Sequence, residues 1–470
     1  MFSHLIQKEL RHYMHDFRFV AIFVLCASLS ALSVYVGGEK YRQQLREYMT
    51  VSQSNQNRLR TTLEKGYISN LWWFGYNWNR RPEVLSPLVY GLSGKLGQEV
   101  NLHAQRPVEF EGSSFETDPV HALFGVLDLD FIVKIVLSLC VLLLTYDSIC
   151  GEKEAGTLRL YASFSVSRSR LAVAKLAGST LAIVVPLSFA FLLASAVLAL
   201  SPRVSLQVQD WMRIVALMGV FVLYLMVFIA FGLWISASTH RRLTAFLSLL
   251  CLWTIWIFVV PDIAVRIARY LSPVESIYDM EKRIDTIRWE MRARKVEEIG
   301  AYQERTRVEN LDSITPVQQE EAQRVHRAAY KSIRRKWNLQ FYRSMSDLQA
   351  VRHRQMQKQR DLLSVLSSLS PLGAISFTSM DIARTGPIQQ ARIIGVMGPH
   401  LVYLDSFIQE NWILPSEIRD LTDFSPFTYR DTDTLGDCMS RNAFHFVNLV
   451  LLALVGFSGA YMALMKYDVR

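Results

Sequence analysis

The sequence predicts a mainly α-helical membrane protein with six spans, a long helical hairpin outside the membrane and a smaller mixed unit beside it. Hydrophobic residues make up 51% of the 470 residues, and they are gathered in six apolar blocks. Each block is close to the roughly 20 residues that a helix needs to cross a bilayer. Polar stretches separate these blocks, so the charged fraction is still 20% and the formal net charge is +9. A membrane protein with substantial aqueous parts fits these figures.

The chain opens with an amphipathic segment, residues 1–16, in which apolar residues such as Phe2 and Leu10 alternate at helical spacing with charged ones such as Lys8. We expect this helix to lie in the cytoplasmic membrane surface. The apolar residues 17–38 follow and end in two glycines. This run is too long for the core of a signal peptide, so we expect an uncleaved first span.

Residues 39–128 are predicted to form a unit outside the membrane. The stretch up to residue 65 lacks Pro, which favours a helix that continues out of the first span. An aromatic cluster that includes Trp72 and Trp78 follows, and a short strand is expected near residues 108–110. The aromatic cluster fits either a small core or a belt at the membrane surface, and both interpretations stay open.

The charges of the short loops orient the spans, because Lys and Arg are retained on the cytoplasmic side. Basic residues are frequent at both termini and in the loops after spans two and four, whereas the loop 201–210 holds only Arg203. We therefore expect both termini in the cytoplasm, a cytoplasmic loop at 151–175 and an extracytoplasmic insertion at 261–442. The predicted spans are residues 17–38, 129–150, 176–200, 213–236, 243–260 and 443–466.

The insertion between spans five and six predicts two long helices that pair as an antiparallel hairpin. Apolar residues from Ile277 to Met291 recur at alternating spacings of three and four, which gives one seam. A second helix begins at Thr315-Pro-Val-Gln318, where Thr caps and Gln closes a capping box. It is expected to run unbroken to Leu369, which at 1.5 Å per residue is about 80 Å.

The second of these helices is strongly basic, and two interpretations stay open. Its basic side would meet anionic lipid, polysaccharide or an acidic protein. Alternatively, it is the solvated face of a coiled coil whose countercharges lie on the first helix. The candidate countercharges are Glu281, Glu290, Glu297 and Glu298.

The charged loop between spans two and three is the most distinctive segment. It reads Cys150-Gly-Glu-Lys-Glu-Ala-Gly-Thr-Leu-Arg159. Gly151 can end the second span, Gly156 permits a sharp turn, and Thr157 can cap a short helix lying across the cytoplasmic end of the hairpin. Such a helix is expected to dock a cytoplasmic partner.

A longer pattern surrounds this loop. It comprises Asp147, Gly151-Glu-x-Glu-x-Gly-Thr-Leu-Arg159, Val166-Ser-Arg168, Lys175 and, at the N-terminus, Lys8-Glu9-Leu10. The pattern resembles the coupling loop of ABC transporter permeases of the type-2 export class. The large insertion between spans five and six is similar to a bacterial subgroup labelled multicopper-enzyme-maturation-type permeases.

The resemblance implies a permease without an ATPase of its own. It implies a homodimer or heterodimer with a second permease chain, driven by separate ABC ATP-binding subunits that hold ATP and Mg. It also implies a set of ATPase-coupling residues, namely Glu152, Glu154, Gly156, Thr157, Leu158, Arg159, Arg168, Lys8 and Glu9. The alternative for Glu152 and Glu154 is that they are solvated turn residues that balance Lys153.

Charged residues inside spans are costly and indicate pairing or function. Asp130 and Lys134 lie one helical turn apart near the outer end of span two, which predicts a local ion pair. Asp147, near the inner end, is expected to hold an Arg or Lys of the coupling loop.

No catalytic motif stands out, so we expect no enzymatic activity in this chain. The phosphate-binding pattern Gly-x-x-x-x-Gly-Lys-Ser/Thr is absent, and Gly91-Leu-Ser-Gly-Lys95 is the nearest approach. Copper is suggested by the subgroup label alone, because His353 and Met356 are the only close pair of soft ligands; no metal is expected.

The five cysteines form no metal or disulfide pattern. Cys26, Cys140, Cys150 and Cys251 are predicted to be small core residues. Cys438 is expected outside the membrane, either free or paired between chains.

The sequence thus predicts a permease subunit of an ATP-driven exporter in a bacterial inner membrane. It would move a substrate or transmit force to a periplasmic protein, with membrane lipid around it and no nucleic acid involved. The rival prediction is a membrane-anchored structural or interaction protein whose periplasmic coiled-coil hairpin binds a partner without an ATPase.

Overall fold

A computed structural model describes residues 2–95, 97–104, 108, 110–111, 127–157, 168–200, 206–306, 316–411 and 421–466. Within these ranges the chain is mainly helical, with one three-stranded sheet. Six helices are long and apolar enough to cross a membrane, which confirms the predicted fold class. They are Phe17–Glu64, Leu129–Glu154, Arg168–Ala199, Val208–Ser238, Arg242–Leu271 and Ala443–Lys466.

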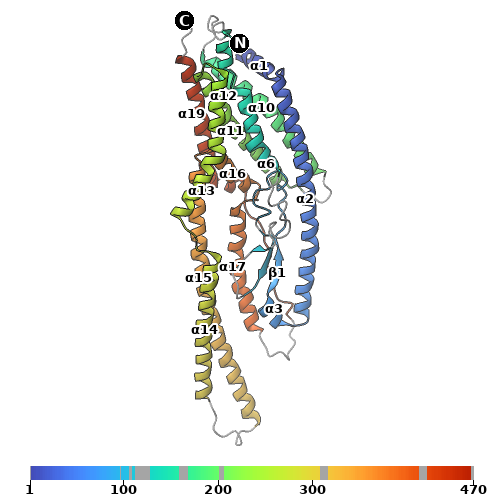
Figure 1. The fold of residues 1–470 in the computed structure, drawn as a ribbon. Coiled ribbons are helices and arrows are strands. Elements are labelled where there is room, and N and C mark those ends of the chain that lie inside the picture. The colour runs from blue at the N-terminus through green and yellow to red at the C-terminus, as the bar shows by residue number, and fades with distance from the viewer. Residues whose placement is uncertain are drawn as a thin grey trace.

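The elements are named as in Figure 1. Two segments, η1 and η2, are π-helices within longer helices. The bounds are α1 Phe2–Met14, α2 Phe17–Glu64, α3 Ile68–Phe74, β1 Tyr76–Asn79, β2 Glu99–Leu102, β3 Phe110–Glu111, α6 Leu129–Phe131, η1 Ile132–Leu137, α7 Ser138–Thr145, α8 Cys150–Glu154, α10 Arg168–Ala199, α11 Val208–Ser238, α12 Arg242–Thr254, η2 Ile255–Val259, α13 Val260–Leu271, α14 Ile277–Arg305, α15 Pro316–Ser367, α16 Pro371–Ile382, α17 Pro387–Glu410, α18 Leu435–Arg441 and α19 Ala443–Lys466.

The molecule is elongated, and its two ends differ in character (Figure 1). The helix α1 and the C-terminal end of α19 lie at one end, beside the apolar helices. The hairpin of α14 and α15 extends to the other end, and the small sheet, α3 and α17 lie between this hairpin and the second half of α2. The two chain ends therefore share one side of the apolar bundle.

The first span continues as one helix of 48 residues, which agrees with the predicted extension. The glycine pair at its centre does not end it. A Cβ on Gly37 would lie 3.2 Å from the carbonyl oxygen of Pro87, and one on Gly38 would lie 3.6 Å from Val197. These glycines therefore allow neighbouring segments to approach the helix closely.

The helix that contains predicted span five also extends beyond residue 260. The helix continues through Pro261 to Leu271, because Pro261 falls in the first turn of α13, directly after the π-helix η2. Proline is tolerated in a first turn, and a π-helix changes the local hydrogen-bond pattern before it. The helix therefore extends past the predicted span boundary at residue 260 and leads without a break into the insertion.

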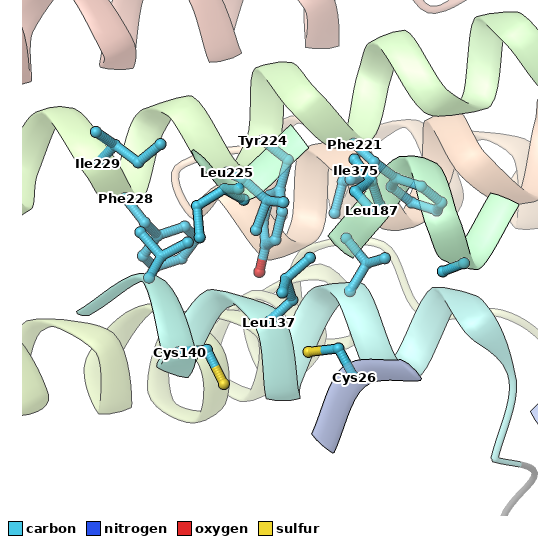
Figure 2. Packing of buried hydrophobic residues seen from close by; sticks show 14 of the residues in the cluster. Cys26, Leu137, Cys140, Leu187, Phe221, Tyr224, Leu225, Phe228, Ile229 and Ile375 are labelled. Atoms are coloured by element: carbon cyan, nitrogen blue, oxygen red, sulfur yellow. The ribbon is translucent and has the colours of Figure 1, made fainter. Parts of the chain in front are cut away.

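The main core surrounds α11, which packs against α19, α10, α7 and α16. Figure 2 shows Tyr224 and Phe228 of α11 facing the helix that carries Leu137 and Cys140. Tyr224 and Phe228 are arranged edge to face, a favourable geometry for buried pairs. Phe221 makes the same kind of contact with Phe191 of α10. The six-helix bundle thus has a closely packed interior.

A second core lies around the small sheet. The strands β1, β2 and β3 form an antiparallel sheet, with Trp78 opposite Val100 and Phe110 opposite Val100 on its other side. Trp72 and Trp78 pack against this core, which also includes apolar residues of α17. For these two tryptophans the small-core interpretation is correct. Trp73, in contrast, is 61% exposed.

The predicted second helix of the hairpin is continuous over 52 residues and packs against both α14 and α13. Glu298 of α14 accepts hydrogen bonds from Lys336 Nζ at 2.9 Å and from Trp337 Nε1 at 2.5 Å. Glu298 was one of the four predicted countercharges. Since α13 continues span five, the hairpin is joined to the membrane helix by direct packing.

The cysteines are mostly where they were predicted. Cys26, Cys140 and Cys150 are buried, and Cys26 of α2 and Cys140 of α7 lie on neighbouring helices (Figure 2). Cys251 is exposed on α12, so its predicted core position was wrong. Cys438 is completely buried beside Asp381, and burial raises the pKa of its thiol to about 12. A thiol in this environment is not placed to pair with another chain.

Candidate functional site

The charged loop begins with a short helix rather than with a span end. A turn at residues 146–149 separates α7 from α8. The hydroxyl of Ser236 in α11 accepts hydrogen bonds from the backbone N–H groups of Ile149 and Cys150, each at 3.0 Å. Gly151 lies inside α8, so its predicted role as the end of the span was wrong. A Cβ at this position would lie 3.2 Å from Nε of Arg242.

Lys175 is the centre of a buried charge cluster at this end of the molecule. Its side chain is almost fully buried, and Nζ lies 2.8 Å from Oε1 of Glu152 and 3.4 Å from Oε2 of Glu9. Nζ also donates to the carbonyl oxygen of Ser148 at 3.0 Å. One ammonium therefore joins α1, α8 and α10. Because buried charges need partners, these contacts fix the relative positions of the three helices.

The first helix is held on α10 by more than this ion pair. Tyr13 donates to Ser148 Oγ at 3.1 Å and accepts from Ser179 Oγ at 3.1 Å, and burial raises the pKa of Tyr13. A Cβ on Gly178 would lie 2.7 Å from Cβ of Glu9. Glycine is therefore required for the close approach of α1 to α10.

This packing corrects the predicted position of α1. Glu9 was expected on the charged, solvent-facing side of an interfacial helix, but it is only 3% exposed. Lys8 remains exposed and lies 3.9 Å from Glu9. The side of α1 that packs against the protein thus includes the carboxylate of Glu9, because this carboxylate pairs with the buried Lys175 of α10.

The two residues after Glu152 contact two further helices. Lys153 Nζ donates to the carbonyl oxygens of Ala237 and Thr239 at the end of α11. Glu154 pairs with Arg242 at the start of α12, with 3.1 Å between Oε2 and Nε. The alternative in which Glu152 and Glu154 merely balance Lys153 is therefore wrong. Three consecutive charged residues connect the loop to three different helices.

Beyond Glu154 the loop turns toward solvent. Gly156 has a φ of +70°, which fits the predicted sharp turn, and Thr157 is exposed. Thr157 donates to the carbonyl oxygen of Glu152 at 3.3 Å. Leu158 and Arg159 lie outside the described residues. Glu154, Gly156 and Thr157 therefore form a surface that a partner can reach.

Two other predicted residues have different partners from those expected. Asp147 Oδ2 accepts from Arg18 Nη1 of α2 at 2.8 Å, so its expected partner in the coupling loop was wrong. Arg168 donates to the carbonyl oxygens of Leu464 and Met465 at 3.0 and 2.8 Å. It thus stabilises the C-terminal end of α19, where a positive charge is favoured.

The predicted ion pair of Asp130 and Lys134 is present and buried at the opposite end of span two. Lys134 Nζ also lies 3.2 Å from Ser379 Oγ of α16. The backbone carbonyl of Lys134, which belongs to η1, accepts a hydrogen bond of 2.7 Å from Tyr224. This cluster attaches α16 to the end of the bundle opposite the charged loop.

A larger charged cluster beside α16 was not predicted from the sequence. Arg441 Nη2 lies 2.8 Å from Asp433 and 3.2 Å from Asp381, and Arg392 lies 2.7 Å from Asp433. Arg213 of α11 is 1% exposed and donates to the carbonyl oxygens of Ile382 and Asp433 at 2.8 and 3.0 Å. The sequence signal for this cluster was Arg213 at the start of a predicted span, because an arginine at such a position rarely lacks a partner.

The described residues contain no group of three or more His, Cys, Asp or Glu side chains placed to hold a metal ion. His353, one of the two soft ligands named above, lies 2.9 Å from Nε2 of Gln357. At the loop, a buried charge cluster around Lys175 instead joins α8 to α1 and α10, and partly exposed contacts of Lys153 and Glu154 join it to α11 and α12.

A comparison with models of protein families gives a match over residues 4–469, to the family described as "ABC-2 family transporter protein". No curated protein matches the chain.

Proposed function

Since the chain belongs to the ABC-2 family of transporter proteins, and so is a membrane transport component rather than an ATPase, we propose that the exposed turn after α8 receives the force of ATP hydrolysis. The energy would come from separate ABC ATP-binding subunits, which the family implies as partners. The chain would act as the permease subunit of an exporter, paired with a second permease chain.

The observation that supports this proposal most strongly is how the loop is attached to the helices around it. Glu154, Gly156 and Thr157 are exposed, whereas Glu152 one turn earlier is bound to the buried Lys175. A push on the exposed turn would therefore reach α10 and α1 through Lys175. It would reach α12 through the pair of Glu154 and Arg242. The pair of Glu152 and the buried Lys175 suits this role because its separation is energetically costly, whereas the pair of Glu154 and Arg242 is partly exposed.

The basic residues at this end support its assignment to the cytoplasm of a bacterial inner-membrane protein. Both chain ends lie beside the loop (Figure 1), as an even number of spans requires. The hairpin of α14 and α15 would then stand outside the membrane, in the periplasm.

The external hairpin favours force transmission to a periplasmic partner. The helix Arg242–Leu271 begins at Arg242, which pairs with Glu154 of the charged loop, and runs without a break into the insertion. The long helix α15 packs along α13, the outer part of this rod. A tilt of span five would therefore move the hairpin, which gives one continuous route from the loop to the outside.

The proposal is tested by purifying the native complex and measuring its ATPase activity. We expect nucleotide-binding subunits to co-purify with the chain. Glu154→Gln should reduce the coupling between this chain and ATP hydrolysis while leaving membrane insertion intact, because it removes the charge that pairs with Arg242. The matched control is Glu47→Gln, an exposed carboxylate on the outer half of α2.

Two results would contradict the proposal. One is a native complex without any nucleotide-binding subunit, which would favour the membrane-anchored interaction protein. The other is ATPase coupling that is equal in the Glu154 and Glu47 variants, which would show that the loop does not receive the force.

A further inference from the structure

The external unit contains a cavity of about 990 Å³ that is unrelated to the charged loop. The outer half of α2 forms one wall, and β1 with residues 80–84 forms another. Further walls come from α17 and from residues 426–429, and Gln207 lies at the edge, next to the start of α11. This volume is at the upper end of the roughly 300–1,000 Å³ of ligand sites in proteins.

The charges that line the cavity cancel. Four arginines and four carboxylates face it, and three of each are paired with one another. The separations are 2.7 Å for Arg60–Glu64, 3.1 Å for Arg80–Glu83 and 3.0 Å for Arg384–Asp431. The remaining Arg81 and Asp210 carry one charge of each sign, so the lining has no net charge that would attract an anion or a cation. The electrostatics therefore favour a neutral ligand.

Side-chain amides supply many of the polar groups. Asn55 Nδ2 donates to Asn79 Oδ1 at 2.7 Å, and Asn77 Nδ2 donates to Glu99 Oε1 at 2.8 Å. On the opposite wall, Gln389 Nε2 lies 3.2 Å from Asp431 Oδ2. These contacts hold the amides in place, and each amide has further donor or acceptor capacity for a ligand. The cavity is thus preorganised for a ligand rich in hydroxyl groups.

Aromatic side chains lie among these amides. Tyr48, Trp78 and Tyr429 line the cavity and are half-buried. The Trp78 ring is fixed by an edge-to-face contact with Phe427, with 5.4 Å between the ring centroids. Flat apolar faces beside planar amides match a sugar ring, which has an apolar face of C–H groups and an edge of hydroxyls.

A peptide fits less well, because the strand next to the cavity is not free to pair. β1 bonds to β2 on one side, and α2 packs against it, with Asn55 bound to Asn79. Addition of a peptide strand needs an open sheet edge. From the size, neutrality, amides and aromatic rings, we propose that this cavity binds a short, neutral oligosaccharide. This site is independent of the proposed coupling to an ATPase.

The test measures binding of defined saccharides to the full-length chain in lipid nanodiscs, without detergents that carry sugar headgroups. The probes are maltotetraose, cellotetraose and chitotetraose, with tetragalacturonate as an anionic control and tetraalanine as a peptide control. Binding is followed by isothermal titration and by saturation-transfer NMR. We expect at least one neutral tetrasaccharide to bind with a Kd of about 1 mM or tighter, and both controls to bind more weakly.

Variants on one helix locate the site. Ser52 and Tyr48 line the cavity, whereas Gln53 is exposed on the same helix outside it. Ser52→Trp should narrow the cavity and Tyr48→Ala should remove a stacking face, each weakening binding by about tenfold or more. Gln53→Trp, which adds the same side chain next to the site, should bind like the natural protein.

The proposal is overturned if none of the three neutral sugars binds, or if tetragalacturonate or tetraalanine binds as well as they do. It is also overturned if Ser52→Trp and Tyr48→Ala leave saccharide binding unchanged. Should Ser52→Trp fail to fold, Tyr48→Ala alone decides. Because no ATPase subunit takes part, this result is separate from the test of the coupling proposal.

Discussion

Lys175 carries its charge at a buried position between Glu9 and Glu152. Lys175→Met would leave two carboxylates beside an apolar side chain. Removal of one partner from a buried ion pair typically costs about 3–5 kcal/mol. We expect this variant to lower the free energy of unfolding by that amount, measured by thermal unfolding of the purified protein in nanodiscs.

A charge-free variant provides the control for Lys175. In Glu9→Gln/Glu152→Gln/Lys175→Met no uncompensated charge remains, so most of the lost stability should return. If the triple variant is as unstable as the single one, side-chain packing rather than charge accounts for the role of Lys175.

Asp433 makes the stability of the folded protein depend on pH in the acidic range. Burial would by itself raise the pKa of Asp433, but hydrogen bonds from Arg441 and Arg392 hold that pKa well below its usual value of 3.8. A carboxyl with a depressed pKa in the folded state stabilises the protein above its unfolded pKa, and this contribution is lost as the pH falls further. We therefore expect stability to decline as the solution is acidified below the usual carboxyl range.

Asp433→Asn tests this dependence on pH. The amide cannot be titrated, so the variant should be less stable near neutral pH and should lose less additional stability between roughly pH 5 and pH 2. Chemical unfolding of both proteins across that interval measures the difference. Parallel curves for the two proteins would show that Asp433 is not the group responsible.

At the scale of elements, α15 is a helix of 52 residues whose outer part is covered on one side only. Ala350 is exposed near its middle. Relative to Ala, Pro costs about 3 kcal/mol and Gly about 1 kcal/mol in a helix interior. We expect Ala350→Pro to lower hydrogen-exchange protection strongly in the hairpin and Ala350→Gly to lower it slightly.

The hydrogen-exchange protection of α11 is the internal reference for these two variants. It packs in the other core, so its protection should not change. Loss of protection in α11 as well would mean that the hairpin and the membrane bundle unfold as one unit. Equal effects of Pro and Gly would mean that α15 is not a continuous helix.

At the scale of the whole molecule, six candidate spans put both chain ends on one side and the hairpin on the other. We expect trypsin added to intact spheroplasts to cut within the hairpin, for instance after the exposed Arg335. A tag at the C-terminus should survive until the membrane is permeabilised. Immunoblotting detects both events, and early loss of the tag would reverse the proposed topology.

The sequence by itself determined the features that depend on neighbours along the chain. Apolar runs long enough to cross a bilayer predicted the six spans. The absence of Pro between residues 39 and 65 predicted the continuation of α2, and the cap before Pro316 predicted α15. The pair of Asp130 and Lys134 was accessible for the same reason, since residues four apart on a helix lie on one face.

Only the tertiary structure decided which charges meet across the fold. Lys175 binds Glu9, which is 166 residues away in the chain, and Asp147 binds Arg18, which is 129 residues away. A charge pattern shows that such groups need partners, but not which helix supplies them, because that depends on the packing of the whole bundle. The same holds for the cavity, whose walls come from α2, β1 and α17 and enclose a space that no single segment defines.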